Sequence, residues 1–205
     1  MADLTRSAAV DGRRKSLTLR GSRVLIADRK LHAAQQEVQS GLVDHLKRLW
    51  RYGYVLSRQR DVAEDLVQAT CLRAIERATQ YAPGTRLDRW LFSILHSIWI
   101  DEVRSRRIRL GGGIVEADTA LVVDGEQENE TRLMANQVLK LVDALPEAQR
   151  NAVFLAYVEG LSYKEIAEVL DIPIGTVMSR LANARAKLAD NLAAAKEQPL
   201  RERRD

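Results

Sequence analysis

The sequence predicts an all-α protein with two small helical domains joined by a flexible acidic linker. Apolar residues recur three and four positions apart along the chain, which is the period of an amphipathic helix, whereas no stretch shows the strict alternation of a half-buried strand. At residues 111–131, three consecutive glycines are followed by a stretch rich in acidic residues and free of basic ones. Such a segment has little apolar surface to bury, so we expect it to be the linker.

The composition is typical of a soluble globular protein. Hydrophobic residues make up 46% of the 205 residues and charged residues 29%. No run of about 18 apolar residues occurs, and the basic N-terminus is not followed by an apolar stretch, so we expect neither membrane insertion nor a secretory signal. The single cysteine, Cys71, cannot form an internal disulfide, which favours a reducing, cytoplasmic location.

The distribution of charge divides the chain further, although the formal net charge is only +4. Residues 1–40 are basic and poor in aromatic residues, so we expect a disordered extension or a weak DNA-binding arm. The first helical domain is expected over residues 41–110 and the second over residues 132–194. A charged tail at residues 195–205 follows.

Two amphipathic helices open the first domain. The apolar face of the first is marked by Leu42, Leu46, Leu49 and Trp50. The second has an unbroken helical stripe made of Ala63, Leu66, Val67, Thr70, Cys71, Ala74, Ile75 and Ala78. Its opposite face carries Asp65, Gln68 and Glu76, with Leu72 among them. That face is either an ordinary solvated surface with one exposed leucine or a docking surface for a partner.

A third helix is expected to begin near Leu87, after the break at Pro83-Gly84. Residues 90–100 are apolar on nearly all sides of this helix, and the helix then continues into Arg104, Arg106, Arg107 and Arg109. Aromatic side chains beside arginines suit unstacked nucleic acid, because rings stack on bases while guanidinium groups bind phosphates. The alternative is a core helix whose basic last turn is favoured by the helix dipole.

The second domain is punctuated like a helix-turn-helix. One helix is expected over residues 146–159, between a proline in its first turn and a glycine after its end. Ser162 and Glu165 have the spacing of a capping box and would open a short helix. After a brief turn, Pro173 starts the last helix, which we expect to end near residue 194. Two helices joined by so tight a turn indicate a helix-turn-helix.

The last helix has distinct core and polar faces. At 100° per residue, the apolar side chains lie within roughly 60° of one another and form the expected buried stripe. This stripe consists of Val177, Leu181, Ala184 and Leu188. The neighbouring face has polar and basic side chains without an acid, namely Thr176, Ser179, Arg180, Asn183 and Lys187. Such side chains bind phosphates and base edges in the major groove, whereas an ordinary solvated face mixes Glu with Lys.

Several of these stretches resemble bacterial RNA polymerase sigma factors. Residues 61–74, which read DVAEDLVQATCLRA, are similar to the D-A-E-D-L-V-Q-E-T-F-L-R-A signature of that family, and residues 90–94, which read WLFSI, also resemble the family. In the second domain, residues 145–147, 160–167 and 175–181 look like the C-terminal helix-turn-helix of the family. With only these two domains, the chain resembles the small extracytoplasmic-function (ECF) group.

The resemblance implies a role for each surface. Docking on the β′ clamp of core RNA polymerase would use Glu64, Asp65, Gln68 and Leu72. Capture and melting of the −10 promoter element would use Tyr81, Trp90, Ser97 and Trp99, and the duplex upstream would be held by Arg104, Arg106, Arg107 and Arg109. The −35 element would be read by Thr176, Ser179, Arg180, Asn183 and Lys187, while the second domain packs on the β flap. The implied function is promoter-specific transcription initiation, and an anti-sigma factor is a further implied partner.

Three positions depart from the family pattern. Ser97 stands where the family often has an asparagine implicated in −10 contacts, and serine has a shorter reach and fewer hydrogen-bonding atoms. Ala69 and Cys71 replace the usual Glu and Phe of the docking-helix motif. We therefore expect an altered −10 preference and, through the loss of one acid at Ala69, weaker binding to the core polymerase.

The sequence does not indicate an enzyme. His32, His45, His96 and Cys71 show no metal-ligand spacing, and we find neither a phosphate-binding glycine loop nor a nucleophile motif, so no cofactor or metal is expected. The main alternative function is a stand-alone helix-turn-helix regulator, which would bind duplex operator DNA by itself, usually as a dimer. A protein–protein adaptor, which would bind no DNA, is a third hypothesis.

Overall fold

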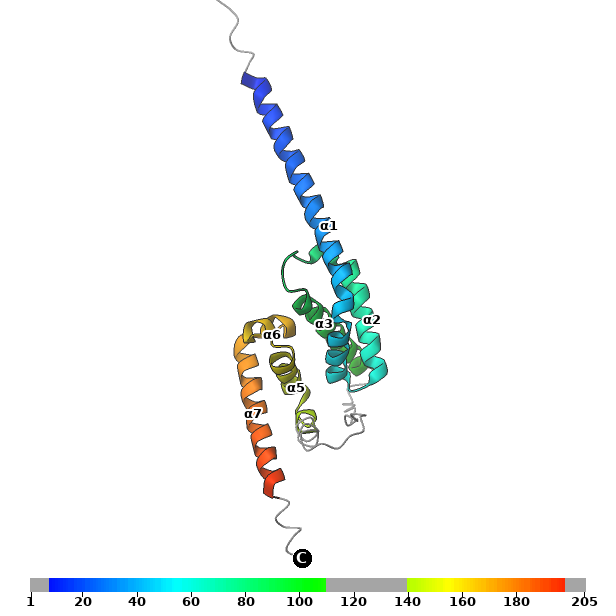
Figure 1. Cartoon of the computed structure of the whole chain (residues 1–205), viewed down its shortest axis with the longest axis vertical. Helices are drawn as coiled ribbons and strands as arrows, with labels where there is room; N and C mark the ends of the chain where they lie inside the picture. Colours follow the sequence, from blue (N-terminus) through cyan, green and yellow to red (C-terminus); the bar gives the residue numbers. More distant parts are fainter. Residues whose placement is uncertain (1–7, 110–139, 198–205) are drawn as a thin grey trace, which may run out of the picture.

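The computed structural model of the chain describes residues 8–109 and 140–197, with side chains described over residues 29–109 and 140–192. Every regular element within these ranges is helical, which confirms the predicted fold class. Figure 1 shows two helical bodies beside each other, with α1 extending well beyond both. The expected linker at residues 111–131 lies outside the described residues, and the domain boundaries stay a prediction.

The first body consists of three long helices and one short turn. They are α1 (Ala8–Ser57), α2 (Arg60–Glu76), the 3-10 turn η1 (Ala78–Gln80) and α3 (Leu87–Arg109). In the core the rings of Tyr52 and Phe92 meet edge to face, with 5.4 Å between their centroids. Gly53 permits the close crossing of α1 and α2, because a Cβ at this position would lie 3.3 Å from the backbone of Ala63.

Helix α1 includes much of the segment that the sequence led us to expect as disordered. The expected extension, residues 1–40, has no helix end at residue 40, since α1 continues through it. Ala34 and Val38 are buried, and the hydroxyl of Tyr81 lies 2.7 Å from Oε1 of Glu37. This correction concerns residues 34–38, where packing against the loop around Tyr81 stabilises the helix. Sequence composition alone does not report such a long-range contact.

The second body contains the predicted helix-turn-helix. It is formed by α5 (Glu147–Val153), the π-helical turn η2 (Phe154–Val158), α6 (Tyr163–Leu170) and α7 (Ile174–Glu197). The single helix expected over residues 146–159 therefore widens in its second half, where the Glu159 amide bonds to the Phe154 carbonyl five residues earlier at 3.1 Å. Gly160 then ends this segment with a left-handed backbone, at φ 67°.

The start and end of α6 agree with the sequence-based prediction. The capping box is present: the Glu165 amide donates to Ser162 Oγ at 3.3 Å, and the Ser162 amide donates to Glu165 Oε2 at 2.8 Å. Asp171 ends α6 in the left-handed region at φ 51° and turns the chain into α7. The expected core stripe of α7 is also confirmed, since Val177, Leu181 and Ala184 are fully buried.

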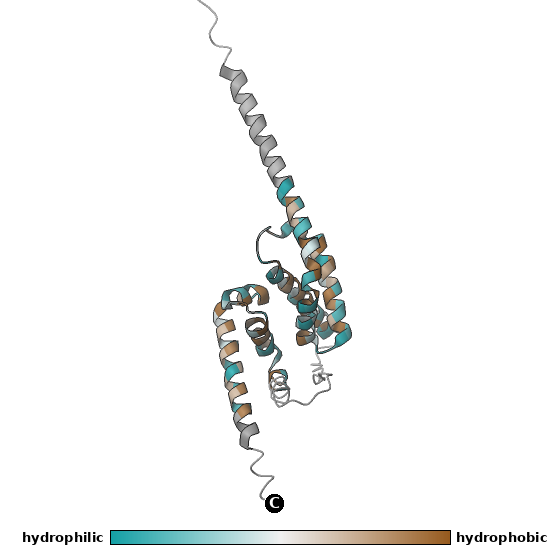
Figure 2. Cartoon of the chain, viewed as in Figure 1, coloured by the Kyte–Doolittle hydropathy of each residue, from teal (hydrophilic) through white to brown (hydrophobic). Residues whose placement is uncertain are grey.

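The two bodies are in contact, with α6 packed against α3 and α5 close to α1. The ring of Tyr52 stacks on that of Phe154 across this contact, with 5.6 Å between centroids and an interplanar angle of 14°. The buried guanidinium of Arg150 donates to the carbonyl of Val55 at 3.0 Å. Figure 2 shows hydrophilic and hydrophobic turns alternating along α1, α2 and α7, as expected of helices with one face in a core.

Candidate nucleic-acid and protein interfaces

The outward face of α2 presents the residues that the sequence predicted for docking. All four predicted residues are exposed, namely Glu64, Asp65, Gln68 and Leu72. Ile75, which we expected in the core, is 48% exposed, so that prediction was wrong. It follows Leu72 by three residues and therefore lies on the same face of the helix. This face thus combines acidic and amide groups with two exposed aliphatic side chains, a combination suited to binding a protein.

Two of the departures from the family pattern lie beside this face rather than on it. Ala69 and Cys71 are both half-buried in α2. Burial raises the pKa of the Cys71 thiol, which keeps it protonated. A glutamate at position 69 would therefore stand at the edge of the docking face, where alanine contributes no charge.

One face of α3 joins an aromatic residue to a basic end. Trp90, Ser97 and Arg104 are spaced by seven residues, which places them on nearly the same side of the helix. Trp90 is half-buried, while Ser97 and Arg104 are exposed. The structure thus brings three of the predicted −10 residues together along one line.

The four arginines at the end of α3 differ in their surroundings. Glu102 accepts a hydrogen bond from Arg106 at 2.9 Å and lies 3.5 Å from Arg109. Arg104 and Arg107 are exposed, and neither forms an ion pair with any residue that the structure describes. Two guanidinium groups are therefore available to bind phosphates without first breaking a contact.

Tyr81 and Trp99, the other two predicted −10 residues, are buried. The Tyr81 side chain is 3% exposed, and its ring lies 5.3 Å from that of Trp90. Trp99 is 7% exposed, and its indole N–H donates to Glu147 Oε1 of the second body at 2.7 Å. Neither side chain offers an open surface to DNA while the two bodies are in contact.

An open hollow of about 290 Å³ lies beside Trp90, at the boundary between the bodies. Tyr81, Trp90 and Ser93 line it from the first body, and Glu168 and Val169 of α6 line it from the second. A base extruded from a duplex needs an aromatic surface of this kind to stack on. Here a carboxylate from the second body stands at the same hollow.

The polar face of α7 is only partly open to solvent. Ser179, Asn183 and Lys187 are exposed, whereas Thr176 and Arg180 are half-buried. The hydroxyl of Ser179 donates to the Thr176 carbonyl at 3.0 Å. The helix therefore presents hydrogen-bonding and basic groups along one side, as a helix that enters a major groove does.

Arg180 acts on the first body through its charge. Burial, with a further contribution from Arg180, lowers the pKa of His96 from 6.5 to about 4, so the imidazole is neutral at pH 7. His96 Nδ1 lies 3.1 Å from the hydroxyl of Tyr52. Because burial raises the pKa of Tyr52, that hydroxyl stays protonated and can donate to the imidazole. The predicted −35 residue Arg180 is thus directed toward the boundary between the bodies.

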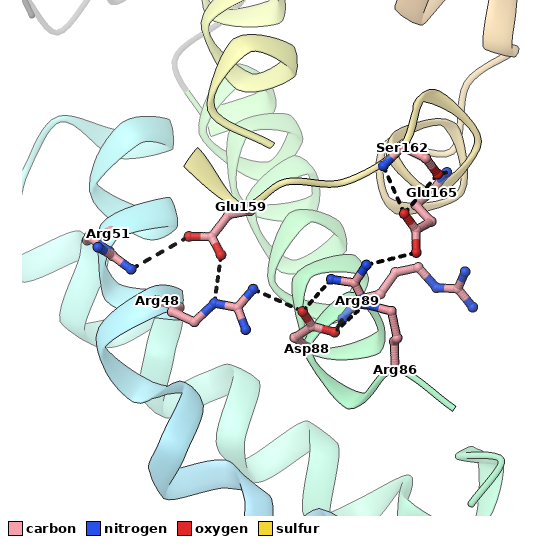
Figure 3. A network of polar contacts seen from close by, with 8 residues as sticks. All are labelled: Arg48, Arg51, Arg86, Asp88, Arg89, Glu159, Ser162 and Glu165. Carbon is pink, nitrogen blue, oxygen red and sulfur yellow. Dashed lines mark hydrogen bonds and ion pairs between the residues drawn. The ribbon is translucent and has the colours of Figure 1, made fainter. Parts of the chain in front are cut away.

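A network of ion pairs that sequence reasoning missed crosses this boundary (Figure 3). Arg48 of α1 bonds to Glu159 Oε2 at 2.7 Å and to Asp88 Oδ2 at 2.9 Å. Arg86 continues the chain of contacts, bonding to Asp88 at 2.8 Å and to Glu165 of α6 at 3.0 Å. Although burial raises the pKa of Asp88, hydrogen bonds from Arg86 and Arg48 lower it well below its ordinary value. Asp88 is therefore ionised and holds the two arginines in place.

Neither a metal site nor a membrane span is found in the parts of the chain that the structure describes. No group of histidine, cysteine and acidic residues over residues 8–109 and 140–197 has the arrangement of metal ligands. Within those same ranges, no helix is both long enough and apolar enough to cross a bilayer.

Together, a helix-turn-helix, a second helical body with free arginines and an exposed docking face define a DNA-binding protein that also binds a protein partner. The sequence models of two families agree with this division: Sigma-70 region 2 matches residues 42–108, and Sigma-70, region 4 matches residues 135–188.

Similar proteins narrow the class further. The ECF RNA polymerase sigma factor SigE of Mycolicibacterium smegmatis is 39% identical over 153 residues, which cover 73% of this chain and 59% of SigE. EcfG of Rhodopseudomonas palustris, also an ECF sigma factor, is 33% identical over 134 residues, which cover 65% of this chain and 73% of EcfG. The sigma factor RpoE of Bartonella quintana, solved with the anti-sigma factor NepR, superposes with a TM-score of 0.64 at 28% identity, covering 77% of this chain and 98% of RpoE.

The chain therefore belongs to the ECF family of RNA polymerase sigma factors, which are transcription initiation factors and not enzymes.

Proposed function

We propose that this sigma factor docks on core RNA polymerase through the exposed face of α2 and reads promoter DNA with α3 and α7. The observation that carries the proposal is the joint exposure of Glu64, Asp65, Gln68 and Leu72 on one helix face that no other described element covers. The β′ clamp is the surface proposed to receive this face. The second body would pack on the β flap.

The proposed DNA contacts follow from chemistry and exposure. Ser179, Arg180 and Asn183 would bond base edges in the −35 major groove, with Thr176 and Lys187 at the flanking phosphates. At the −10 element, an extruded base would stack in the hollow beside Trp90, where Tyr81, Ser97 and Trp99 are close by along the same body. The four arginines from position 104 to position 109 would hold the duplex backbone just upstream. No bond of the DNA is broken, so melting is driven by binding energy alone.

Two further features belong to this proposal. A protein that restrains the sigma factor is supported by the similar Bartonella sigma factor, which was solved with an anti-sigma factor. We also place the chain in the bacterial cytoplasm, where core polymerase and promoters are found. The linker proposed at residues 111–131 would let the two bodies reach separate DNA elements.

Substitution of Asp65 tests the docking face. Asp65→Arg inverts a charge on an exposed side chain, so the fold should persist while association with purified core polymerase is lost. Association is measured by co-elution in gel filtration and by run-off transcription on genomic fragments. Asp190→Arg, at an exposed aspartate on α7, is the matched control and should co-elute like the wild type. Normal co-elution of the Asp65 variant would show that the docking face lies elsewhere.

The same assay separates the alternative function. A stand-alone helix-turn-helix regulator would bind duplex DNA tightly by itself, and core polymerase would add nothing to its specificity. The proposed function predicts weak DNA binding by the free chain and promoter-specific transcripts only when core polymerase is present.

A further inference from the structure

The contact between the two bodies has a uniform charge pattern. In each ion pair across the boundary the first body supplies an arginine and the second body supplies an acid. The pairs are Arg48–Glu159 at 2.7 Å, Arg86–Glu165 at 3.0 Å, Arg89–Glu168 at 3.1 Å and Arg58–Asp143 at 3.8 Å. Figure 3 shows the first two as one continuous chain of contacts through Asp88. The second body thus presents carboxylates to a basic surface of the kind that binds phosphates.

The acidic groups also cover the proposed −10 surface. Glu168 lines the hollow beside Trp90, and Glu147 accepts the indole N–H of Trp99. Arg180 of the second body is drawn toward the same boundary, where its charge contributes to the lowered pKa of His96. Residues proposed for both promoter elements are therefore engaged within the chain itself.

The closed arrangement is incompatible with reading both promoter elements at once. The −10 and −35 elements are about 25 base pairs apart, which at roughly 3.4 Å per base pair is on the order of 85 Å of duplex. Here α6 packs directly against α3, and the rings of Tyr52 and Phe154 are 5.6 Å apart. The two bodies must separate before each can occupy its own element.

We propose that the acidic face of the second body, formed by Glu147, Glu159, Glu165 and Glu168, is a built-in competitor for promoter phosphates that holds the free sigma factor closed. We call these four residues the acidic latch. The inference rests on the proposed function, because it assumes that the covered surface binds DNA. The sigma factor opens when core polymerase binds the two bodies at separate sites.

The geometry of Glu159 makes the acidic latch reversible. Its carboxylate is only 2% exposed, and one oxygen bonds to Arg48. The other oxygen has no hydrogen-bond partner and lies 3.8 Å from Arg51. A buried ion pair stabilises a contact only when its remaining groups are also satisfied, since the desolvation cost is large. The closed state is therefore held firmly enough to predominate and loosely enough to be opened by a partner.

Energy transfer between two dyes tests the closed state in the full chain. Cysteines are introduced by Gln39→Cys on α1 and Lys164→Cys on α6, both exposed positions outside every proposed interface, in a Cys71→Ala background. The reference chain should show high transfer efficiency when free, and the efficiency should fall when core polymerase is added. Adding Glu159→Gln and Glu168→Arg should lower the efficiency in the free chain. The matched control Asp190→Arg should leave it unchanged.

The open variant should also bind core polymerase more tightly. If the reference chain is competent only when open, the apparent affinity should rise on the order of tenfold, because the open fraction no longer limits binding. Far-ultraviolet circular dichroism checks that the variant is folded. Adding Arg89→Glu re-forms the pair with Glu168→Arg in the opposite sense, and it should restore part of the energy transfer even if the other substitutions weaken the fold.

Two results would overturn the acidic latch. One is low transfer in the free reference chain, and the other is an unchanged efficiency after Glu159→Gln and Glu168→Arg. Both are measured without polymerase or DNA and are therefore independent of the proposed function. A chain that is closed when free but never associates with core polymerase would instead contradict the proposed function.

Discussion

Acid should destabilise this protein through His96, and the size of the effect follows from the pKa. The folded chain holds the His96 pKa at about 4, through burial and the charge of Arg180, against 6.5 for an ordinary histidine. The unfolded chain therefore binds the proton more tightly. The stability contributed by neutral His96 is complete above pH 6.5 and is lost as the pH falls toward 4. At about 1.36 kcal/mol per pKa unit the full loss is about 3 kcal/mol, of which about 2 kcal/mol is reached at pH 5.

Urea unfolding followed by tryptophan fluorescence measures this loss. His96→Asn keeps a polar side chain beside Tyr52 but cannot take up a proton, and the carboxylates that titrate in the same range are common to both proteins. Between pH 8 and pH 5 the wild type should lose about 2 kcal/mol more than the variant. His32→Asn, on an exposed part of α1, should behave like the wild type. Parallel losses in the wild type and His96→Asn would refute the assignment of the effect to His96.

Two further predictions concern the second body. Arg180→Ala should reduce promoter-specific initiation by roughly 5–150-fold, the equivalent of about 1–3 kcal/mol for a base contact. Run-off transcription measures it, and an equal loss on scrambled −35 sequences would make Arg180 a phosphate contact. Ser162→Ala removes the side-chain half of the capping box and should cost about 1 kcal/mol in the free energy of unfolding by urea. An unchanged unfolding midpoint would show that the cap is dispensable.

Features with a local cause were predictable from the sequence. The capping box needs only the spacing of Ser162 and Glu165, and the buried stripe of α7 needs only the helical period of its apolar residues. The exposed face of α2 was predicted for the same reason. Its error at Ile75 is also local, since the helix ends one residue later and this side chain shares the outward face of Leu72.

Features that depend on contacts between distant segments could not be predicted. Arg48 and Glu159 are separated by 111 residues, and nothing in the pattern around either one names the other. The burial of Trp99 against Glu147 likewise depends on how the second body meets the first. The folded segment around Val38 has the same origin, because its partner is the loop at Tyr81. The sequence identified many of the side chains that would act, but not the way in which they cover one another.

The π-helical turn η2 makes the coupling of the two bodies sensitive to a single insertion. Its hydrogen bonds span five residues in place of four, so the turn holds one residue more than an α-helix would. Deleting that residue would shift the phase of the following side chains by about 100°, turning Glu159 away from Arg48. The helix-turn-helix begins only after Gly160 and would keep its own cap and core. A change in chain length of one residue can therefore disconnect the domains while each remains intact.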